Sequence, residues 1–312
     1  MPELGSFISL GDRRVLTGSC SWTDRTLVGE SDFYPAKTMS AKERLQFYAA
    51  HFPLTEIDST YYAPPSEQQA QLWAERTPEG FRFDVKAYSL LTGHPTRPKS
   101  LWRDLRDELP GDVLEKRNLY PHHLPDELLE EAWRRFADAL RPLHEAGKLG
   151  AILFQYPAWF TPRKENRREV ETLRERLSDY LISVEFRSPL WTQEERGRQR
   201  TLRMLGEHGL VFVSLDAPRA SELPRVIAVT NPELFMMRFH GRSDETWHDT
   251  SRSGAERFRY LYSSKELREL AKPIVEHVDE ARETHLLMNN CYRDYAVRNA
   301  AELRDILGRL SK

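Results

Sequence analysis

Short apolar segments alternate with longer amphipathic segments along this chain. The short segments are rich in Val, Ile, Leu and Phe, which is typical of parallel strands that are buried on both faces. The pattern therefore predicts eight strands. They are expected at residues 15–21, 54–60, 81–87, 149–155, 181–186, 210–216, 234–240 and 285–290.

The segments between these strands have the features of helices. Apolar residues form one stripe over 126–146 and another over 293–310. Four pairs also have the spacing of a capping box, in which each residue satisfies a backbone donor of the other. These pairs are Ser40 with Glu43, Ser66 with Gln69, Thr192 with Glu195, and Ser263 with Glu266.

Eight strands that are each followed by a helix close naturally into a barrel. We therefore predict a single α/β domain over residues 1–312, an eight-stranded parallel (β/α)8 TIM-type barrel. The alternative, an open doubly wound sheet, requires a glycine-rich phosphate loop after the first strand. Residues 18–21 read Gly-Ser-Cys-Ser and lack that fingerprint.

Two connections are long for a plain barrel. Residues 92–125 follow the third strand and are rich in Pro, Arg and His, whereas residues 241–259 follow the seventh and are rich in Arg, Ser and Asp. Both leave the carboxyl end of a strand, where barrel enzymes build their sites, so both are candidate lids. The alternative is a surface elaboration or a disordered excursion.

Composition narrows the class of protein. A formal net charge of −2 argues against a chain that binds nucleic acid through its overall charge, although a local basic patch remains compatible with it. Two cysteines cannot form a disulfide framework, and neither a signal peptide nor a spanning segment is evident. We expect a soluble cytoplasmic protein with no membrane association.

Every predicted strand becomes polar at its carboxyl end. Charged side chains within such apolar runs are costly unless they face a wet pocket or a partner. We therefore expect one polar pocket at the mouth of the barrel. The polar residues at the strand ends include Cys20, Glu56, Asp58, Asp84, Lys86, Gln155, Glu185, Arg187, Asp216, Arg238, His240, Asn289 and Asn290.

Three chemical interpretations fit these residues. In the first, Lys86, Arg187 and Arg238 clamp a phosphorylated or nucleic-acid ligand. In the second, Glu185, Asp216 and His240 hold a divalent metal ion, with Glu56 or Asp58 as a further ligand, and the site hydrolyses a phosphoester. In the third, Glu56 and Glu185 are the carboxyl pair of a glycoside hydrolase. The predicted catalytic residues are thus Glu56, Asp58, Glu185, Asp216 and His240.

Two further alternatives stay open. The site can be a non-catalytic binder of an anionic metabolite, or it can be a structural plug in which Arg187 pairs with Glu185 and Lys86 pairs with Asp58. Aromatic and amide side chains near the mouth are expected to complete a ligand site. These expected contacts are Trp22, Tyr61, Gln155, Trp247, Asn289 and Asn290.

Cys20 and Cys291 follow the first and last strands, which are neighbours in a closed barrel. They can form a disulfide or a thiol pair for a metal, or they can be inert buried thiols, which is the usual state of such residues.

Several stretches resemble the YecE-like family, domain of unknown function 72, in the same order along nearly the whole chain. They include residues 18–22 (GSCSW), 55–62 (TEIDSTYY), 81–86 (FRFDVK), 153–157 (LFQYP), 184–187 (VEFR), 239–242 (FHGR) and 288–290 (MNN). The resemblance implies a barrel of this type and no particular reaction. The family has been compared with metal-dependent barrels that cut damaged DNA. Cys291 departs from the family pattern, which more often has His or Asp there.

Overall fold

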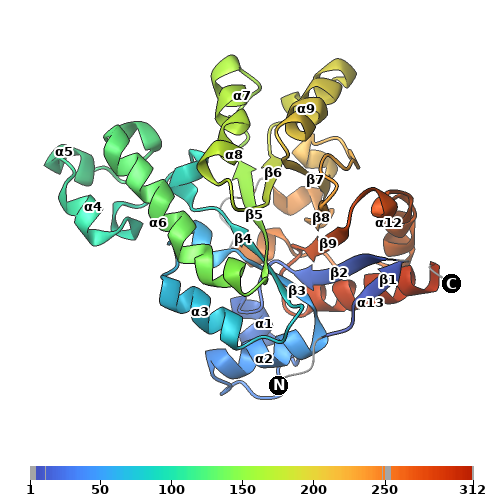
Figure 1. Cartoon of the computed structure of the whole chain (residues 1–312). Coiled ribbons are helices and arrows are strands. Elements are labelled where there is room, and N and C mark those ends of the chain that lie inside the picture. The colour runs from blue at the N-terminus through green and yellow to red at the C-terminus, as the bar shows by residue number, and fades with distance from the viewer. Residues whose placement is uncertain (1–4, 11, 248, 250–253, 311–312) are drawn as a thin grey trace.

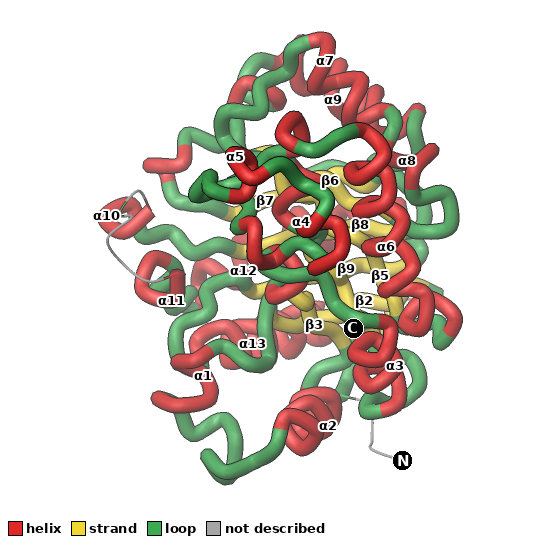
Figure 2. Tube along the Cα trace, turned by 90° about the vertical axis from the view of Figure 1, so that its left-hand side faces the viewer, coloured by secondary structure: helices red, strands yellow, loops and turns green. Residues whose placement is uncertain are grey.

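Eight parallel strands form a closed barrel at the centre of the structure (Figures 1 and 2). The computed structural model describes residues 5–10, 12–247, 249 and 254–310. The first barrel strand pairs with the last, from Arg14 beside Glu283 to Ser19 beside Met288, which closes the sheet. The predicted (β/α)8 fold is confirmed. The barrel strands are β2 Arg13–Ser19, β3 Leu54–Ile57, β4 Arg82–Lys86, β5 Leu149–Tyr156, β6 Ile182–Phe186, β7 Val211–Asp216, β8 Leu234–Phe239 and β9 Glu283–Met288.

A ninth strand, β1 Ile8–Leu10, pairs with β2 in the antiparallel direction. The sequence did not predict it, because a segment of this length contains too few positions to establish an alternating pattern. Ile8 is buried against the core, so β1 covers apolar surface beside the start of β2.

Helices surround the barrel (Figure 2). Their apolar stripes face the strands, and in α6 the stripe buries Leu128, Phe136, Leu140 and Leu143. Among the described residues, no helix is long and apolar enough to span a membrane. The main helices are α1 Arg25–Glu30, α2 Ala41–His51, α3 Glu67–Glu75, α6 Asp126–Glu145, α7 Lys164–Glu171, α8 Leu173–Arg176, α9 Glu195–Glu207, α12 Ser264–His277 and α13 Tyr295–Leu310.

One barrel strand has no α-helix after it. The connection from β7 to β8, residues 217–233, is described throughout and contains only a single 3₁₀ turn, Arg219–Ser221. The prediction of a helix after every strand is therefore wrong at this position. Prolines at positions 218, 224 and 232 divide this connection, and its apolar run at 226–229 is too short for a helix of several turns.

The predicted capping residues are only partly correct. Two reciprocal capping boxes form as predicted, Ser40 with Glu43 and Ser263 with Glu266. The Ser66 side chain accepts a hydrogen bond from the Gln69 backbone, but the pair lacks the return bond. Thr192 is not a cap, because α9 begins at Glu195 and Glu194 occupies the cap position. In that case the correct spacing was coincidental.

Both long insertions contain helices. The first carries α4 Arg103–Asp107 and α5 Gly111–Leu114, which lie beside α6 in Figure 1. It is anchored by buried leucines rather than disordered: Leu101, Leu105, Leu109, Leu119 and Leu124. The second carries α10 Asp244–Trp247 and α11 Gly254–Arg257, at the edge of the molecule in Figure 2. Residues 248 and 250–253 of this predicted lid lie outside the described residues.

A charged cluster fills the barrel near the amino ends of its strands. His285 Nδ1 lies 2.8 Å from Asp84 Oδ2, and His285 Nε2 lies 2.9 Å from Glu283 Oε1. Burial alone would lower the pKa of His285, but the Asp84 and Glu283 carboxylates raise it to about 9. Asp84 also accepts a hydrogen bond from the Ala151 backbone. Asp84 therefore supports the far end of the barrel and not its mouth.

Gly150 has to be a glycine because this cluster lies against its backbone. An added Cβ would lie 2.4 Å from Asp84 Oδ1 and 2.7 Å from His285 Cε1. We expect Gly150→Ala to lower the free energy of unfolding by about 1–3 kcal/mol through this overpacking. Gly308→Ala in α13 is the matched control, because nothing lies within 4 Å of its added Cβ. Urea denaturation of both variants is the measurement, and equal stabilities would contradict the account.

Candidate functional site

A cavity of about 1140 Å³ opens at the carboxyl ends of the barrel strands. It lies on the face where the sequence predicted the polar pocket. Nine of the predicted site residues line it: Glu56, Asp58, Tyr61, Lys86, Gln155, Arg187, Arg238, Trp247 and Asn289. The structure thus brings together side chains from six strand ends and two loops.

Arg238 is the central side chain of the cavity floor. It projects from β8, is only 1% exposed, and donates to Glu56 Oε1 over 2.7 Å. Its guanidinium also donates to Glu185 Oε2 and lies 3.5 Å from the Cys20 sulfur. A buried guanidinium is tolerated only when carboxylates compensate it. Arg238 is therefore fixed rigidly between two strands on opposite sides of the floor.

Glu185 lies beneath the cavity and is fully buried. Its Oε1 is 2.6 Å from Arg187 Nε and accepts a hydrogen bond of 2.7 Å from Gln155. Burial alone would raise the pKa of Glu185, but Arg187, Arg238 and His240 hold it well below its usual value. Glu185 is consequently an anion that anchors two arginines. Of the two ion pairs expected in a structural plug, the pair of Arg187 with Glu185 is present.

Lys86 differs from the other charges in the floor. The predicted pair with Asp58 is absent, and among the described residues the Lys86 amine has no hydrogen bond or ion pair. Its nitrogen lies 4.5 Å from the ring centre of Tyr61, in a cation–π contact. Burial lowers the pKa of Lys86, and Arg238 lowers it further. The amine of Lys86 is therefore a cationic group of the cavity floor without a protein anion among the described residues.

Glu56 has one oxygen bound and one oxygen without a partner. Oε1 accepts from Arg238, whereas Oε2 is buried with no hydrogen-bond partner among the described residues. Burial raises the pKa of Glu56 to about 7, even though Arg238 and Lys86 oppose the rise. A carboxyl group that titrates near neutrality beside a cavity is suited to accept or donate a proton.

This arrangement does not fit the predicted glycoside hydrolase. Such enzymes need two carboxyls that flank an open groove. Here Arg238 binds both Glu56 and Glu185, and Glu185 does not line the cavity. Both carboxylates bind the same guanidinium and leave no open groove between them. Glu56 and Glu185 are therefore not the acid and nucleophile of a glycoside hydrolase.

The predicted metal set of Glu185, Asp216 and His240 is also not assembled. Among the described residues, no three His, Cys, Asp or Glu side chains are placed to hold a metal ion. The reason is strand parity. Leu215 packs inside the barrel with Val211 and Val213, so Asp216, the next residue, points outward.

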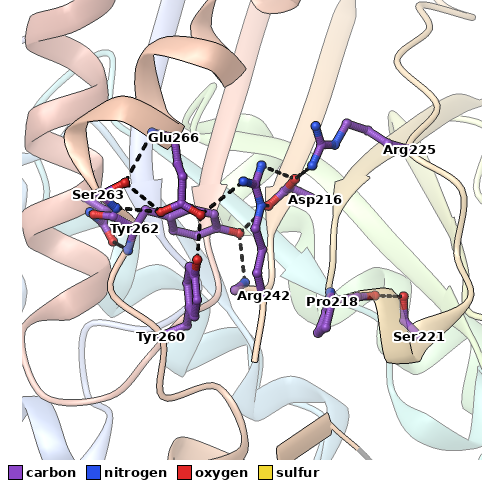
Figure 3. A network of polar contacts seen from close by, with 11 residues as sticks. Asp216, Pro218, Ser221, Arg225, Arg242, Tyr260, Tyr262, Ser263 and Glu266 are labelled. Carbon is purple, nitrogen blue, oxygen red and sulfur yellow. Dashed lines mark hydrogen bonds and ion pairs between the residues drawn. The ribbon is translucent and has the colours of Figure 1, made fainter. Parts of the chain in front are cut away.

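Asp216 instead belongs to a network outside the barrel (Figure 3). Its carboxylate accepts two hydrogen bonds from Arg242, of 2.8 and 2.9 Å, and one of 2.7 Å from the Tyr262 hydroxyl. Arg225 lies 2.7 Å away, and Arg242 continues to Glu266 over 3.1 Å. The network joins both ends of the 241–259 insertion to β7. Asp216 is therefore a structural anchor for the segment that carries Trp247.

Three other predicted residues lie away from the cavity. Trp22 packs edge-on against Trp73 and Phe83 on the outside of the barrel. Asn290 has outward parity and donates to the Tyr260 carbonyl. His240 lies behind the floor, with Nε2 3.3 Å from Glu185.

His240 is unsuited to donate a proton near neutral pH. Burial lowers its pKa to about 3, and Arg187 contributes to that shift. Its Nδ1 lies 2.7 Å from Asn289 Nδ2, which makes Nδ1 the acceptor of that bond. The neutral ring therefore carries its hydrogen on Nε2, toward Glu185. His240 supports the floor instead of facing a ligand.

Sequence reasoning missed several residues that loops bring to the mouth. His94 and Trp159 continue a row of rings from Tyr61, with centroid distances of 5.2 Å and 5.9 Å. Trp159 is 62% exposed, although it is a large apolar residue. On the opposite side Trp247 lies 5.2 Å from the Arg187 guanidinium. The mouth thus offers flat aromatic surfaces on two sides of the cationic floor.

Two residues near the mouth have unfavourable backbone angles. Among the described residues, only Glu222 and Arg293 adopt positive φ without being glycine, at 57° and 49°. Each is adjacent to a residue that lines the cavity, Leu223 and Tyr292. Strain of this kind persists only where the surrounding structure enforces it, and it gathers at functional sites.

The two cysteines are free thiols. Cys20 is buried beneath Arg238, and Cys291 lines the cavity. The alternative of a disulfide between them is therefore not what the structure contains.

Fold and site together define a parallel β/α barrel with a polar cavity at the carboxyl ends of its strands. Residues 16–312 match the family model described as "Protein of unknown function DUF72", and the chain belongs to this family. It is 30% identical over 298 residues to the UPF0759 protein YunF of Bacillus subtilis, covering 94% of each chain.

Two solved structures of this family have the same fold. A DUF72 family protein of Enterococcus faecalis is 26% identical, with a TM-score of 0.75 over 94% of this chain and 95% of its own. A DUF72 family protein of Thermotoga maritima is 28% identical, with a TM-score of 0.71 over 94% of this chain and 98% of its own. These likenesses support the family and the fold, and they name no ligand.

Proposed function

We propose that the cavity binds a small anionic ligand, phosphorylated or part of a nucleic acid. The single observation that carries the proposal is Lys86, a cation that faces the cavity without a protein anion. A structural plug would have paired it, as Glu185 pairs Arg187. An anionic group of the ligand supplies the missing partner and replaces water around the ammonium.

Arg187 is the second contact in this proposal. Glu185 contacts its Nε, and the guanidinium lines the cavity beneath the ring of Trp247. The remaining N–H groups form a planar fork that suits phosphate or carboxylate. Arg238 contributes charge from below, although its two terminal nitrogens already donate to Glu185 and Glu56. The ligand thus binds to Lys86 and Arg187 and is attracted by all three cations.

The rings at the mouth suit the rest of such a ligand. Tyr62 and Trp159 are 70% and 62% exposed, and both line the cavity. Aromatic faces stack on bases and other flat groups with little sequence preference. A phosphate on the floor and a planar group at the mouth would therefore use both surfaces.

Calorimetric titration with AMP, adenosine and inorganic phosphate tests this proposal. We expect AMP to bind about tenfold or more tightly than adenosine, and Lys86→Met to remove most of that difference, because a charged hydrogen bond is lost. Lys265→Met is the control, since Lys265 is exposed on α12. Added salt should weaken AMP binding. No binding of either phosphate or AMP, or equal binding of AMP and adenosine, would contradict the proposal.

Hydrolysis is the finer form of the proposal, and a non-catalytic binder is the alternative. Glu56 is the group placed to donate a proton to a leaving oxygen, because its pKa is about 7. Release of nitrophenol from p-nitrophenyl phosphate by the wild type, lost in Glu56→Gln, would support hydrolysis. Binding of AMP without turnover of this ester would favour the binder.

A further inference from the structure

Among the described residues, two lysines lie in or beside the barrel wall, the buried Lys148 and the half-buried Lys86, and their amines differ in their partners. Lys148 donates to the carbonyl of Thr77 over 2.6 Å and also to that of Ala74. Lys86 has no such acceptor among the described residues and contacts only the face of Tyr61. Lys148 is held by backbone carbonyls, whereas the Lys86 amine lines the cavity and is available to a molecule bound there.

The surroundings of Lys86 make its free-amine form easier to reach than that of a lysine exposed to water. Burial disfavours the ammonium, and the Arg238 and Arg187 charges lower the pKa of Lys86 further, against the opposing effect of Glu56 and Glu185. Amines that react with carbonyl groups are activated in this way, by desolvation and by a neighbouring cation. The free amine carries the lone pair that such a reaction needs.

We propose that Lys86 is a nucleophile that captures the carbonyl group of the ligand as a Schiff base. This inference rests on the proposed function, because Arg187 would hold the anionic end of the same molecule. It narrows the ligand class to aldehydes and oxo compounds that carry a phosphate or carboxylate. The geometry that supports it is an unpartnered amine that lines the same cavity as an acid, Glu56, and an anion-binding fork, Arg187.

The step balances with groups that line the cavity. The Lys86 nitrogen attacks the carbonyl carbon, a C–N bond forms, and the C=O π electrons move to oxygen, which takes the proton released by nitrogen. Protonated Glu56 then donates a proton to the carbinolamine hydroxyl, which leaves as water. The nitrogen lone pair forms the C=N bond of the iminium ion. The products are one iminium, one water and the Glu56 carboxylate.

Glu56 is suited to that proton transfer for a geometric reason. Its Oε1 is held by Arg238, so the carboxyl group is fixed, whereas its buried Oε2 has no partner among the described residues. Glu56 and Lys86 both line the cavity and interact electrostatically. The Glu56 carboxyl therefore supplies the proton that the carbinolamine formed by Lys86 needs in the same cavity.

Reductive trapping with two matched aldehydes tests the proposal. Wild-type protein is incubated with pyridoxal 5′-phosphate or with pyridoxal, reduced with borohydride and digested, and the modified lysines are identified by mass spectrometry. We expect the phosphorylated aldehyde to label Lys86 in preference to exposed lysines such as Lys265. We also expect its labelling of Lys86 to exceed that by pyridoxal about tenfold or more, because Arg187 binds the phosphate.

The outcomes separate this inference from the proposed function. Label on exposed lysines only, while phosphate or AMP still binds in the cavity, would overturn the Schiff base and leave the proposed function intact. Equal labelling of Lys86 by both aldehydes would support the nucleophile and contradict the anion site. Lys86→Arg keeps the charge but cannot form the adduct, so the label at position 86 should be lost. The wild-type result stands even if that variant does not fold.

Discussion

Replacement of Glu185 by glutamine is expected to destabilise the protein by about 3–5 kcal/mol, the usual cost of breaking a buried ion pair from one side. The carboxylate is fully buried and compensates both Arg187 and Arg238. Glutamine keeps the size of the side chain and removes its charge. Arg238 would keep only the carboxylate of Glu56, Arg187 would lose its carboxylate partner, and the amide would present a donor to one of them. The loss is electrostatic and not a loss of packing.

Urea denaturation at neutral pH measures this effect. The matched control is Glu207→Gln, an exposed glutamate at the end of α9, which should change the free energy of unfolding by no more than about 0.5 kcal/mol. A loss below about 1 kcal/mol in Glu185→Gln would mean that solvent compensates the arginines. In that case the floor would not be the rigid charged layer on which the proposed site depends.

Binding of anions in the cavity is expected to weaken as the pH rises through about 7. Burial raises the pKa of Glu56 to about 7, with Arg238 and Lys86 limiting the rise. Below that pH the carboxyl is neutral and the floor attracts an anion. Above it the carboxylate adds a negative charge beside Lys86 and repels the ligand. The affinity for sulfate should therefore fall about tenfold or more between about pH 5.5 and about pH 8.5.

Sulfate is the appropriate probe because its charge is constant over this range, unlike that of phosphate. Glu56→Gln should bind sulfate at the higher pH nearly as well as the wild type does at the lower pH. The ionisation of Glu56 also changes the stability of the fold, and its direction follows from the raised pKa. Because the folded pKa of Glu56 is above the usual 4.5, its contribution to stability is present below pH 4.5 and is lost as the pH rises through about 7. Sulfate binding that is independent of pH in the wild type would contradict this role of Glu56.

The sequence predicted the barrel and most of its floor because both follow from local rules. Apolar runs marked the eight parallel strands, and the polar residues at their carboxyl ends placed Glu185, Arg187 and Arg238 together at one mouth. A charged side chain inside an apolar strand needs a polar pocket or a partner. The sequence therefore indicated that these side chains converge at one mouth of the barrel. The residues of the floor were for this reason predictable before their contacts were known.

The errors arose where local rules do not decide. Strand β7 is buried on both faces, so burial along Val211–Asp216 does not tell which face Asp216 takes. Asn290 after β9 presents the same ambiguity. Loop residues such as His94 and Trp159 reach the mouth through tertiary packing, which periodicity does not report. Their aromatic and basic character was visible in the sequence, but their position was not.

A crystal structure of the protein soaked with tungstate tests the central claim most directly. Tungstate is a tetrahedral oxyanion like phosphate, and its tungsten atom is located by anomalous scattering. We predict a tungstate ion in the cavity, within hydrogen-bond distance of Lys86 Nζ and the Arg187 guanidinium, and its loss in Lys86→Met crystals. Anomalous density confined to the outer surface, with the cavity empty of tungstate, would contradict the anion site.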